Sequence, residues 1–252
     1  MYLYIVITIL IILLNIILII DREEFSNYHI EPTYIFWTGG YDSTFRLCQL
    51  LIDEKKVVKP VYISDIIDND KSKTTRRNSI TQEFDSMEEI TKKLKNKYPY
   101  IKKNMLPLIN INNVKIDKDI HKAMYNLYKK KRMRRPICQY SALAQVSRDL
   151  NKNVEMSVEY APKDSMMYRN VHNSLDCTDK ICKIKDKLDK KNKDLHIFKN
   201  CTFPTIKLSK KNMLEIAKKN GYEDILKLTW SCWYPRNGNP CGRCVMCRER
   251  II

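Results

Sequence analysis

The hydrophobic positions of this chain form one long run followed by many short ones. Residues 1–20 are apolar apart from Thr8 and Asn15, and the run stops at Asp21. Twenty apolar residues are enough to span the ~30 Å hydrocarbon core of a bilayer, and neither a basic n-region nor a small-residue cleavage site marks a signal peptide. We therefore predict a transmembrane or signal-anchor helix over residues 1–20 and a linker over residues 21–33.

The charges around this run predict its orientation. No Lys or Arg precedes it, and many follow it. Because basic flanks stay on the cytosolic side of a membrane, the globular body should be membrane-anchored and face the cytosol. The alternative is a cytoplasmic protein whose apolar N-terminal helix packs on the domain.

From Tyr34 onward, short apolar runs alternate with longer amphipathic ones. This alternation predicts an α/β domain with a Rossmann-like parallel sheet over residues 34–228. A Lys- and Asp-rich segment at 176–194 indicates a solvated insertion. Strands are predicted at 34–37, 57–64, 105–109 and 154–158, helices at 43–54, 79–97, 120–131, 142–150 and 209–220, and extended chain at 198–206.

A glycine pair follows the first predicted strand in the sequence T-G-G-Y-D-S. Two glycines let successive backbone N–H groups point inward, and the helix that follows adds the positive end of its dipole, so the turn suits a pyrophosphate. The spacing matches neither a Walker A loop nor the G-x-G-x-x-G fingerprint. The plainer alternative is an ordinary strand-to-helix turn with an Asp cap. The candidate binding residues are Thr38, Gly39, Gly40, Asp42, Ser43 and Thr44.

Four cysteines near the C-terminus have the spacing C-x8-C-x2-C-x2-C. Four thiolates can surround Zn²⁺ as a tetrahedron, which is the usual structural zinc geometry. We therefore predict a zinc-binding segment over residues 229–252, with Cys232, Cys241, Cys244 and Cys247 as its ligands. The other five cysteines show no disulfide framework, so a reducing compartment is expected. Cys177 and Cys182 are taken as two unrelated thiols, with a bond between them or metal binding as the alternative.

The charge balance adds a question about partners. The 252 residues carry a formal net charge of +17, with 46 basic and 29 acidic side chains. Such a surface attracts polyanions, and the run from Lys129 to Arg135 could follow a phosphate backbone. A composition rich in Lys, Asn and Ile explains the same charge without RNA, so nucleic acid is an alternative that we do not favour. The sequence leaves a homodimer open.

Two of these motifs together resemble a known family. The turn is similar to the PP-loop, S-G-G-x-D-S, of the adenine nucleotide α-hydrolase superfamily. The C-terminal T-W-S-C-W and P-C-G-R-C-V-M-C-R-E-R resemble T-W-S-C-Y and P-C-G-x-C-x-x-C-x-x-R of the 7-cyano-7-deazaguanine synthases. Pro204 and Lys210 match the P-x5-K that precedes a helix in that family.

The resemblance implies an ATP-dependent C–N ligase with ATP, Mg²⁺ and Zn²⁺ as cofactors. It implies that ATP adenylates the carboxylate of 7-carboxy-7-deazaguanine, that ammonia displaces AMP to give an amide, and that a second ATP dehydrates the amide to the nitrile. Asp42, Ser43 and Lys210 are then the candidate catalytic residues. The product would belong to queuosine biosynthesis.

Departures from the family pattern keep two other functions open. Ser64 and Asp65 stand where the family has the end of Y-G-Q, and Cys138 and Gln139 stand where it has R-N. One alternative is a related PP-loop enzyme that adenylates tRNA. The other is an inactive, membrane-tethered homologue that binds zinc and nucleotide.

Overall fold

The structure is a computed structural model that describes residues 31–67, 74–76, 78–130, 138–163, 165–178, 181–248 and 250. Residues 33–252 form one compact unit. The predicted N-terminal helix at 1–20, most of the predicted linker and the basic residues 131–135 lie outside the described residues. Within the described part of the chain, no helix combines the length and the apolar character needed to cross a membrane.

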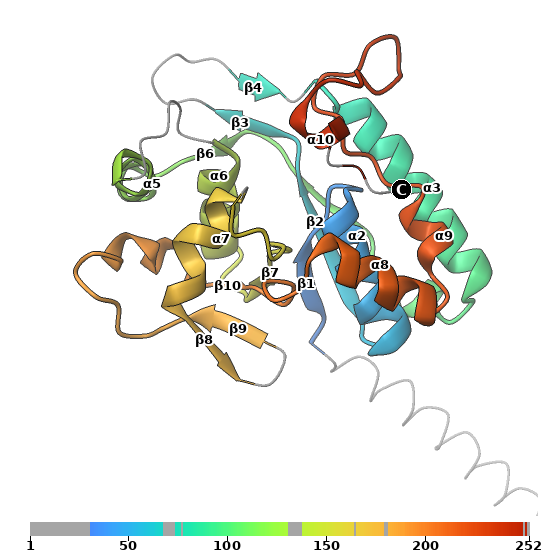
Figure 1. Cartoon of the computed structure of the whole chain (residues 1–252), viewed down its shortest axis with the longest axis horizontal. Coiled ribbons are helices and arrows are strands. Elements are labelled where there is room, and N and C mark those ends of the chain that lie inside the picture. Colours follow the sequence, from blue (N-terminus) through green and yellow to red (C-terminus); the bar gives the residue numbers. More distant parts are fainter. Residues whose placement is uncertain are drawn as a thin grey trace, which may run out of the picture. The chain divides into compact units, whose positions relative to one another are not determined.

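A seven-stranded sheet forms the centre of the fold (Figure 1), in the order β5-β2-β1-β7-β10-β9-β8. The first five strands in that order pair in parallel, whereas β9 is antiparallel to both β10 and β8. The α/β prediction is therefore confirmed, with a mostly parallel sheet. The strands are β1 Thr33–Phe36, β2 Val58–Ile63, β5 Ile109–Ile111, β7 Val154–Glu155, β8 Leu175–Thr178, β9 Ile181–Ile184 and β10 Cys201–Thr202.

Helices cover both faces of this sheet, which is why its central strands are apolar on both sides. Side chains of a strand alternate between faces, so Ile35 and Trp37 join one hydrophobic cluster while Phe36 joins the other. The first cluster contains α2 Tyr41–Cys48 with its π-helical extension Gln49–Asp53, α3 Ile80–Lys97, α4 Ile101–Asn104, α8 Lys210–Lys219 and α9 Glu223–Leu226. The second contains α5 Lys118–Lys130, α6 Cys138–Asp149 and α7 Met166–Val171.

A buried ion cluster fastens α2 to the sheet. Glu155 lies between Val154 and Met156, which both pack on the α5–α6 face, so its carboxylate is directed to the α2 face. There it accepts two hydrogen bonds from Arg46, at 2.7 Å from Nε and 2.9 Å from Nη2. A third bond runs from Arg46 Nη1 to Glu54 Oε1 at 2.5 Å. The two-bond contact of the planar guanidinium thus fixes the position of α2 along β7.

Several predicted elements are confirmed by local signals. Helix α8 starts after Ser209, whose side chain and that of Asn212 form a capping box. It is followed by Gly221 at φ +76°, the left-handed conformation that glycine adopts easily. Helix α3 begins one residue after the predicted start.

The structure corrects three expectations. The strand predicted at 105–109 is β5 at Ile109–Ile111, and Met105 makes only an isolated bridge to Val58. The solvated insertion at 176–194 contains most of a β8–β9 hairpin, whose alternation was hidden among lysines, and the start of a 3₁₀ helix at Lys193–Phe198. Within that hairpin Cys177 and Cys182 are register partners joined by a disulfide, so they are not unrelated thiols.

The sequence pattern did not predict a second, smaller sheet. Its order is β4-β3-β6, with β3 Asp65–Ile67, β4 Thr74–Arg76 and β6 Val114–Lys115. It begins directly after β2, at Asp65. The departure from the family's Y-G-Q therefore falls where the chain leaves the large sheet for the small one.

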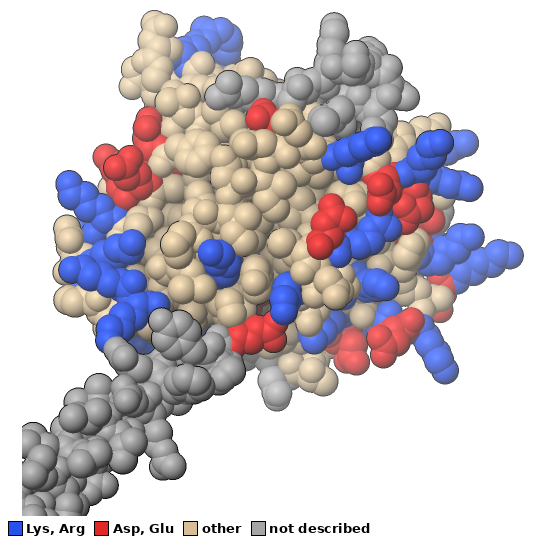
Figure 2. Space-filling model, turned by 180° about the vertical axis from the view of Figure 1, so that it is seen from behind, with Lys and Arg blue, Asp and Glu red and all other residues tan. Residues whose placement is uncertain are grey.

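The face opposite to Figure 1 shows how charge is distributed (Figure 2). Lys and Arg side chains lie mainly toward its two sides, with Asp and Glu among them, around a broad area of other residues. On this face the basic residues do not form a continuous track.

Candidate nucleotide and metal site

The glycine turn lies where the order of the sheet reverses. From β1 the chain adds β2 and then β5 on one side, and it later places β7 and β10 on the other. In open α/β sheets, ligands bind outside the carboxyl ends of the strands at such a switch point. The carboxyl ends of β1 and β7 lead to residues 37–40 and 156–159. These two segments define the candidate site.

Gly39 has a conformation and a position that exclude a side chain. Its φ is +68°, and an added Cβ would lie 3.0 Å from the backbone oxygen of Glu83 and 3.1 Å from Cγ of Met87. Gly40 is extended and is the N-cap residue of α2, and because it has no side chain it cannot cap the first amides of the helix. The first backbone amides of a helix have no partner within the helix. The turn therefore presents N–H groups at a positive helix end, which is the geometry expected for a phosphate.

The side chains of the turn have different surroundings. Asp42 and Ser43, in the first turn of α2, are partly exposed, and the Ser43 hydroxyl donates to the Gly40 carbonyl at 3.3 Å. Thr38 is also partly exposed, and its Oγ1 lies beside Gly40. Thr44 is fully buried, and its Oγ1 accepts a hydrogen bond from the indole of Trp37 at 3.0 Å. Thr44 thus holds α2 to the end of β1 instead of presenting its hydroxyl to solvent.

Lys210 lies beside this turn. It is the first residue of α8, and its ammonium is 3.2 Å from Oε1 of Glu159, which follows β7. Its backbone carbonyl accepts a hydrogen bond of 3.5 Å from the hydroxyl of Tyr41. Burial, followed by the charge of Asp42, raises the pKa of Tyr41 above its usual value, so this phenol stays protonated. The predicted residues Asp42 and Lys210 are thus brought into one region.

Two residues of this region carried no sequence signal. Glu159 contributes the ion pair with Lys210, and Ser157 lies two residues before it. Met156 and Val158 pack on the α5–α6 face, so Ser157 turns toward the α2 face. Its Oγ is shielded from solvent and makes no hydrogen bond with the described residues. A buried hydroxyl without a partner costs about 1–3 kcal/mol, which a ligand oxygen at this site would offset.

The four predicted zinc ligands converge in the C-terminal segment. Their sulfur atoms all lie within 4.8 Å of one another, with 3.9 Å between Cys241 and Cys247 and 3.4 Å between Cys244 and Cys247. Four sulfurs at about 2.3 Å from a common zinc ion lie about 3.8 Å apart. The cluster therefore fits Zn²⁺ with all four positions filled by protein, which is typical of a structural site.

Backbone amides of the same segment point at these sulfurs. The amide of Cys241 donates to the sulfur of Cys232 at 3.2 Å, and that of Cys244 donates to the sulfur of Cys241 at 3.4 Å. The bond from Cys244 lowers the pKa of the Cys241 thiol. Such bonds favour the thiolate form that a metal requires.

The tail that carries the cysteines contacts the glycine turn directly. The backbone N–H of Trp230 donates to the carbonyl of Gly39 at 3.0 Å. The hydroxyl of Ser86, in α3, contacts the same carbonyl at 3.3 Å and that of Leu228 at 2.7 Å. Figure 1 shows the C-terminal segment that leads from this contact with α3 to α10 Val245–Arg248. The motifs at the two ends of the body thus form one region.

The position of the family's Y-G-Q is occupied differently. Ser64 is buried, and its hydroxyl contacts the side chain of Asn112 and the carbonyl of Ile111. Asp65 is the first residue of β3, and Arg76 of β4 lies opposite it in the register of the two antiparallel strands. These residues tie the end of β2 to the small sheet.

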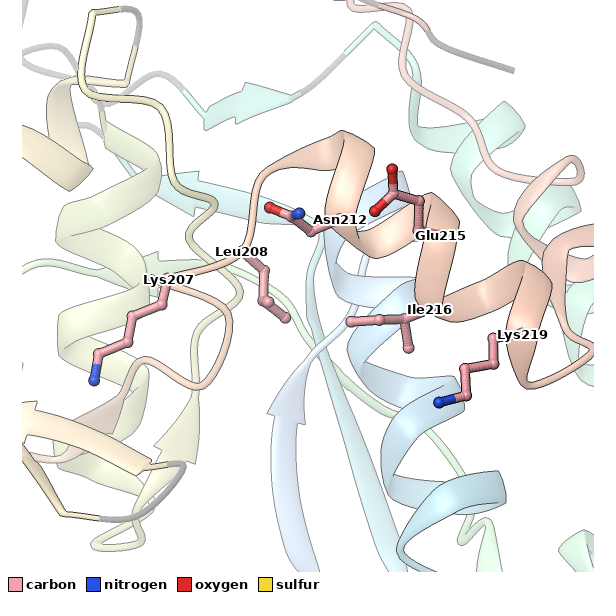
Figure 3. Close-up of a pocket in the computed structure, with 6 residues that line it drawn as sticks. All are labelled: Lys207, Leu208, Asn212, Glu215, Ile216 and Lys219. Carbon is pink, nitrogen blue, oxygen red and sulfur yellow. The ribbon is translucent and has the colours of Figure 1, made fainter.

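A surface hollow of about 440 Å³ lies along α8 (Figure 3). Leu208 and Ile216 extend toward each other, whereas Lys207 points away. The residues that line it are Lys207, Leu208, Asn212, Glu215, Ile216 and Lys219. None of them belongs to the glycine turn or to the cysteine cluster, so we do not assign the hollow to the nucleotide site.

The fold and the site define an α/β protein with a phosphate-type turn at its switch point and a four-cysteine cluster attached to that turn. A family model described as "Queuosine biosynthesis protein QueC" matches residues 141–251. The resemblance to the 7-cyano-7-deazaguanine synthase family is thereby confirmed over that range, which holds Lys210 and the four cysteines. The glycine turn precedes the matched range. None of the curated proteins compared matches the chain.

Proposed function

We propose that this protein is an ATP-dependent synthase of the 7-cyano-7-deazaguanine type. The carboxylate of 7-carboxy-7-deazaguanine attacks the α-phosphate of ATP and releases pyrophosphate. Ammonia then displaces AMP to give the amide. A second ATP activates the amide oxygen, and loss of AMP and a proton leaves the nitrile. The observation that carries this proposal is the position of the glycine turn, at the switch point and beside Lys210.

The residues of the turn would hold the leaving group. Amides at the start of α2 bind pyrophosphate oxygens, and they are already aimed before the charge develops. Mg²⁺, held by the carboxylate of Asp42, would neutralise part of the pyrophosphate charge. Ser43, partly exposed in the same turn, can donate to a phosphate oxygen. No proton has to move to these groups during release of pyrophosphate.

Lys210, Glu159 and Ser157 would form the opposite wall. The ion pair holds the ammonium of Lys210 in place, and a phosphate oxygen can replace or share its carboxylate partner. The Ser157 hydroxyl can donate to the α-phosphate or to the attacking carboxylate. Zn²⁺ on Cys232, Cys241, Cys244 and Cys247 would have no free position for a substrate, so its contribution is structural.

The test is to incubate the full chain with ATP, Mg²⁺, ammonium and 7-carboxy-7-deazaguanine, and to measure AMP, pyrophosphate and the nitrile by mass spectrometry. Two AMP per nitrile are expected. Asp42→Asn should lower turnover by at least about tenfold, since it removes the anionic ligand of the Mg²⁺ that neutralises the leaving group. Asp176→Asn, on the exposed side of β8, is the matched control and should change nothing.

Other outcomes separate the alternatives. If AMP forms only when tRNA is present and does not depend on the deazapurine, this proposal is replaced by adenylation of RNA, a partner that the net charge of +17 would attract. Tight ATP binding and full zinc content without any AMP formation would replace it by an inactive homologue.

A further inference from the structure

The carbonyl of Gly39 is the point at which three distant segments meet. It accepts a hydrogen bond from the backbone N–H of Trp230 at 3.0 Å. The buried hydroxyl of Ser86 lies 3.3 Å from the same oxygen and 2.7 Å from that of Leu228, so it bridges the turn and the tail. The turn, α3 and the C-terminal tail are thus joined at one peptide group.

That peptide group also carries an amide of the phosphate turn. The C=O of Gly39 and the N–H of Gly40 belong to one planar trans unit, in which they point in opposite directions. Fixing the carbonyl toward Trp230 and Ser86 therefore aims the amide of Gly40 the other way. A Gly-Gly peptide rotates easily because neither residue restricts φ and ψ. The amide needs an external clamp to stay aimed.

The clamp continues into the cysteine cluster through Trp230. Its indole Nε1 donates to the carbonyl of Cys232 at 2.8 Å. Cys232 is only 2% exposed, and its sulfur accepts the amide of Cys241. A short series of contacts thus links the sulfur cluster to the Gly39 peptide, and any change in the position of Cys232 reaches the turn through Trp230.

We propose that Trp230 and Ser86 are positioning residues that couple the metal in the cysteine cluster to ATP binding at the turn. With the cluster loaded, the tail is held, the Gly39 carbonyl is engaged, and the Gly40 amide is directed at the phosphate. Without metal, the tail loosens and the peptide rotates. This inference rests on the proposed function only in taking ATP as the ligand of the turn.

Coupling of this kind must act in both directions, because it is one free energy shared by two sites. Removing the metal should weaken ATP binding, and withholding ATP should weaken metal binding by the same factor. We expect about five- to fiftyfold in each direction. Loss of one hydrogen bond in Ser86→Ala should weaken ATP binding about three- to tenfold.

The experiment is calorimetric titration of ATP–Mg²⁺ into the full chain, loaded with Zn²⁺ or stripped by a chelator. The same protein is then titrated with Zn²⁺ from a competing chelator, with and without ATP. Trp230→Phe keeps the backbone amide but removes the indole donor. It should lower toward one both the factor by which metal strengthens ATP binding and the factor by which ATP strengthens metal binding, while one Zn²⁺ per chain is still bound. Ser147→Ala, another buried serine that donates to a carbonyl, is the matched control and should leave both factors unchanged.

Circular dichroism of each variant checks that the core stays folded, and the two variants perturb the link at different points. ATP affinity that is independent of the metal would overturn the coupling. So would equal factors in wild type, Trp230→Phe and Ser86→Ala. A loaded wild-type chain that binds no ATP would overturn both this inference and the proposed function. Coupled binding without turnover would contradict the proposed function alone.

Discussion

Replacing Gly39 by alanine tests the turn most directly. The substitution places a side chain at φ +68°, where an L-residue costs about 1–2 kcal/mol. The new Cβ would also lie 3.0 Å from the Glu83 backbone oxygen, between Met87 and Ser86. Because a backbone atom cannot move aside as a flexible side chain does, overpacking should add about 1–3 kcal/mol. We expect a total loss of about 2–5 kcal/mol in the free energy of unfolding.

Gly221→Ala is the control that separates these two costs. Gly221 has φ +76° after α8, and no atom lies within 4 Å of an added Cβ. It should therefore lose only the conformational part, about 1–2 kcal/mol. Both variants are compared with wild type by urea unfolding followed by circular dichroism, with ATP affinity measured separately. If Gly39→Ala loses no more stability than Gly221→Ala, the close packing of the turn against α3 is not as described.

Three further predictions concern the ion cluster, acid stability and the metal. Arg46→Met leaves the buried Glu155 carboxylate unpaired and should cost about 3–5 kcal/mol in urea unfolding. Arg148→Met removes two exposed ion pairs, to Asp117 and Asp119, and should cost at most about 1 kcal/mol. Equal losses would contradict the conclusion that the Arg46–Glu155 pair is buried. Partial burial opposes ionisation of Asp224, but hydrogen bonds from two α3 lysines outweigh it and lower its pKa. Its contribution, at most about 1 kcal/mol, is present above its unfolded-state pKa and is lost as pH falls through the lower folded-state value. Wild type should thus lose more stability than Asp224→Asn between about pH 7 and pH 3. Cys244→Ser should reduce zinc from one ion per chain to nearly none by elemental analysis, and retained zinc would exclude Cys244 as a ligand.

The features that the sequence predicted are those that depend on residues close together in the chain. The glycine turn, the Ser209 cap and the cysteine spacing each act over a few positions, so their patterns are visible before folding. Ser86, Ser157 and their neighbours enter the site only through the order of the strands and the course of the tail. A single serine in a helix or after a strand has no pattern of its own, and no spacing rule could have selected it.

The second sheet and the hairpin were missed for a different reason. The strands of the second sheet have two or three residues, too few to show an alternation, and the alternation of β8 and β9 was hidden among lysines. The disulfide likewise depended on a register between β8 and β9, which brings Cys177 opposite Cys182. Pairing partners are set by tertiary contacts, which a single sequence does not display.

The contact between the turn and the tail also bears on how the protein is made. Ser86 and Leu228 are 142 positions apart, and Trp230 follows two residues later. A chain emerging from the ribosome completes β1, α2 and α3 long before the tail exists. The Gly39 peptide of a nascent chain therefore has only its contact with Ser86 until residues 228–230 have been synthesised. A chain truncated before Trp230 would keep every residue of its phosphate turn and lack the backbone hydrogen bond from Trp230 that helps to aim it.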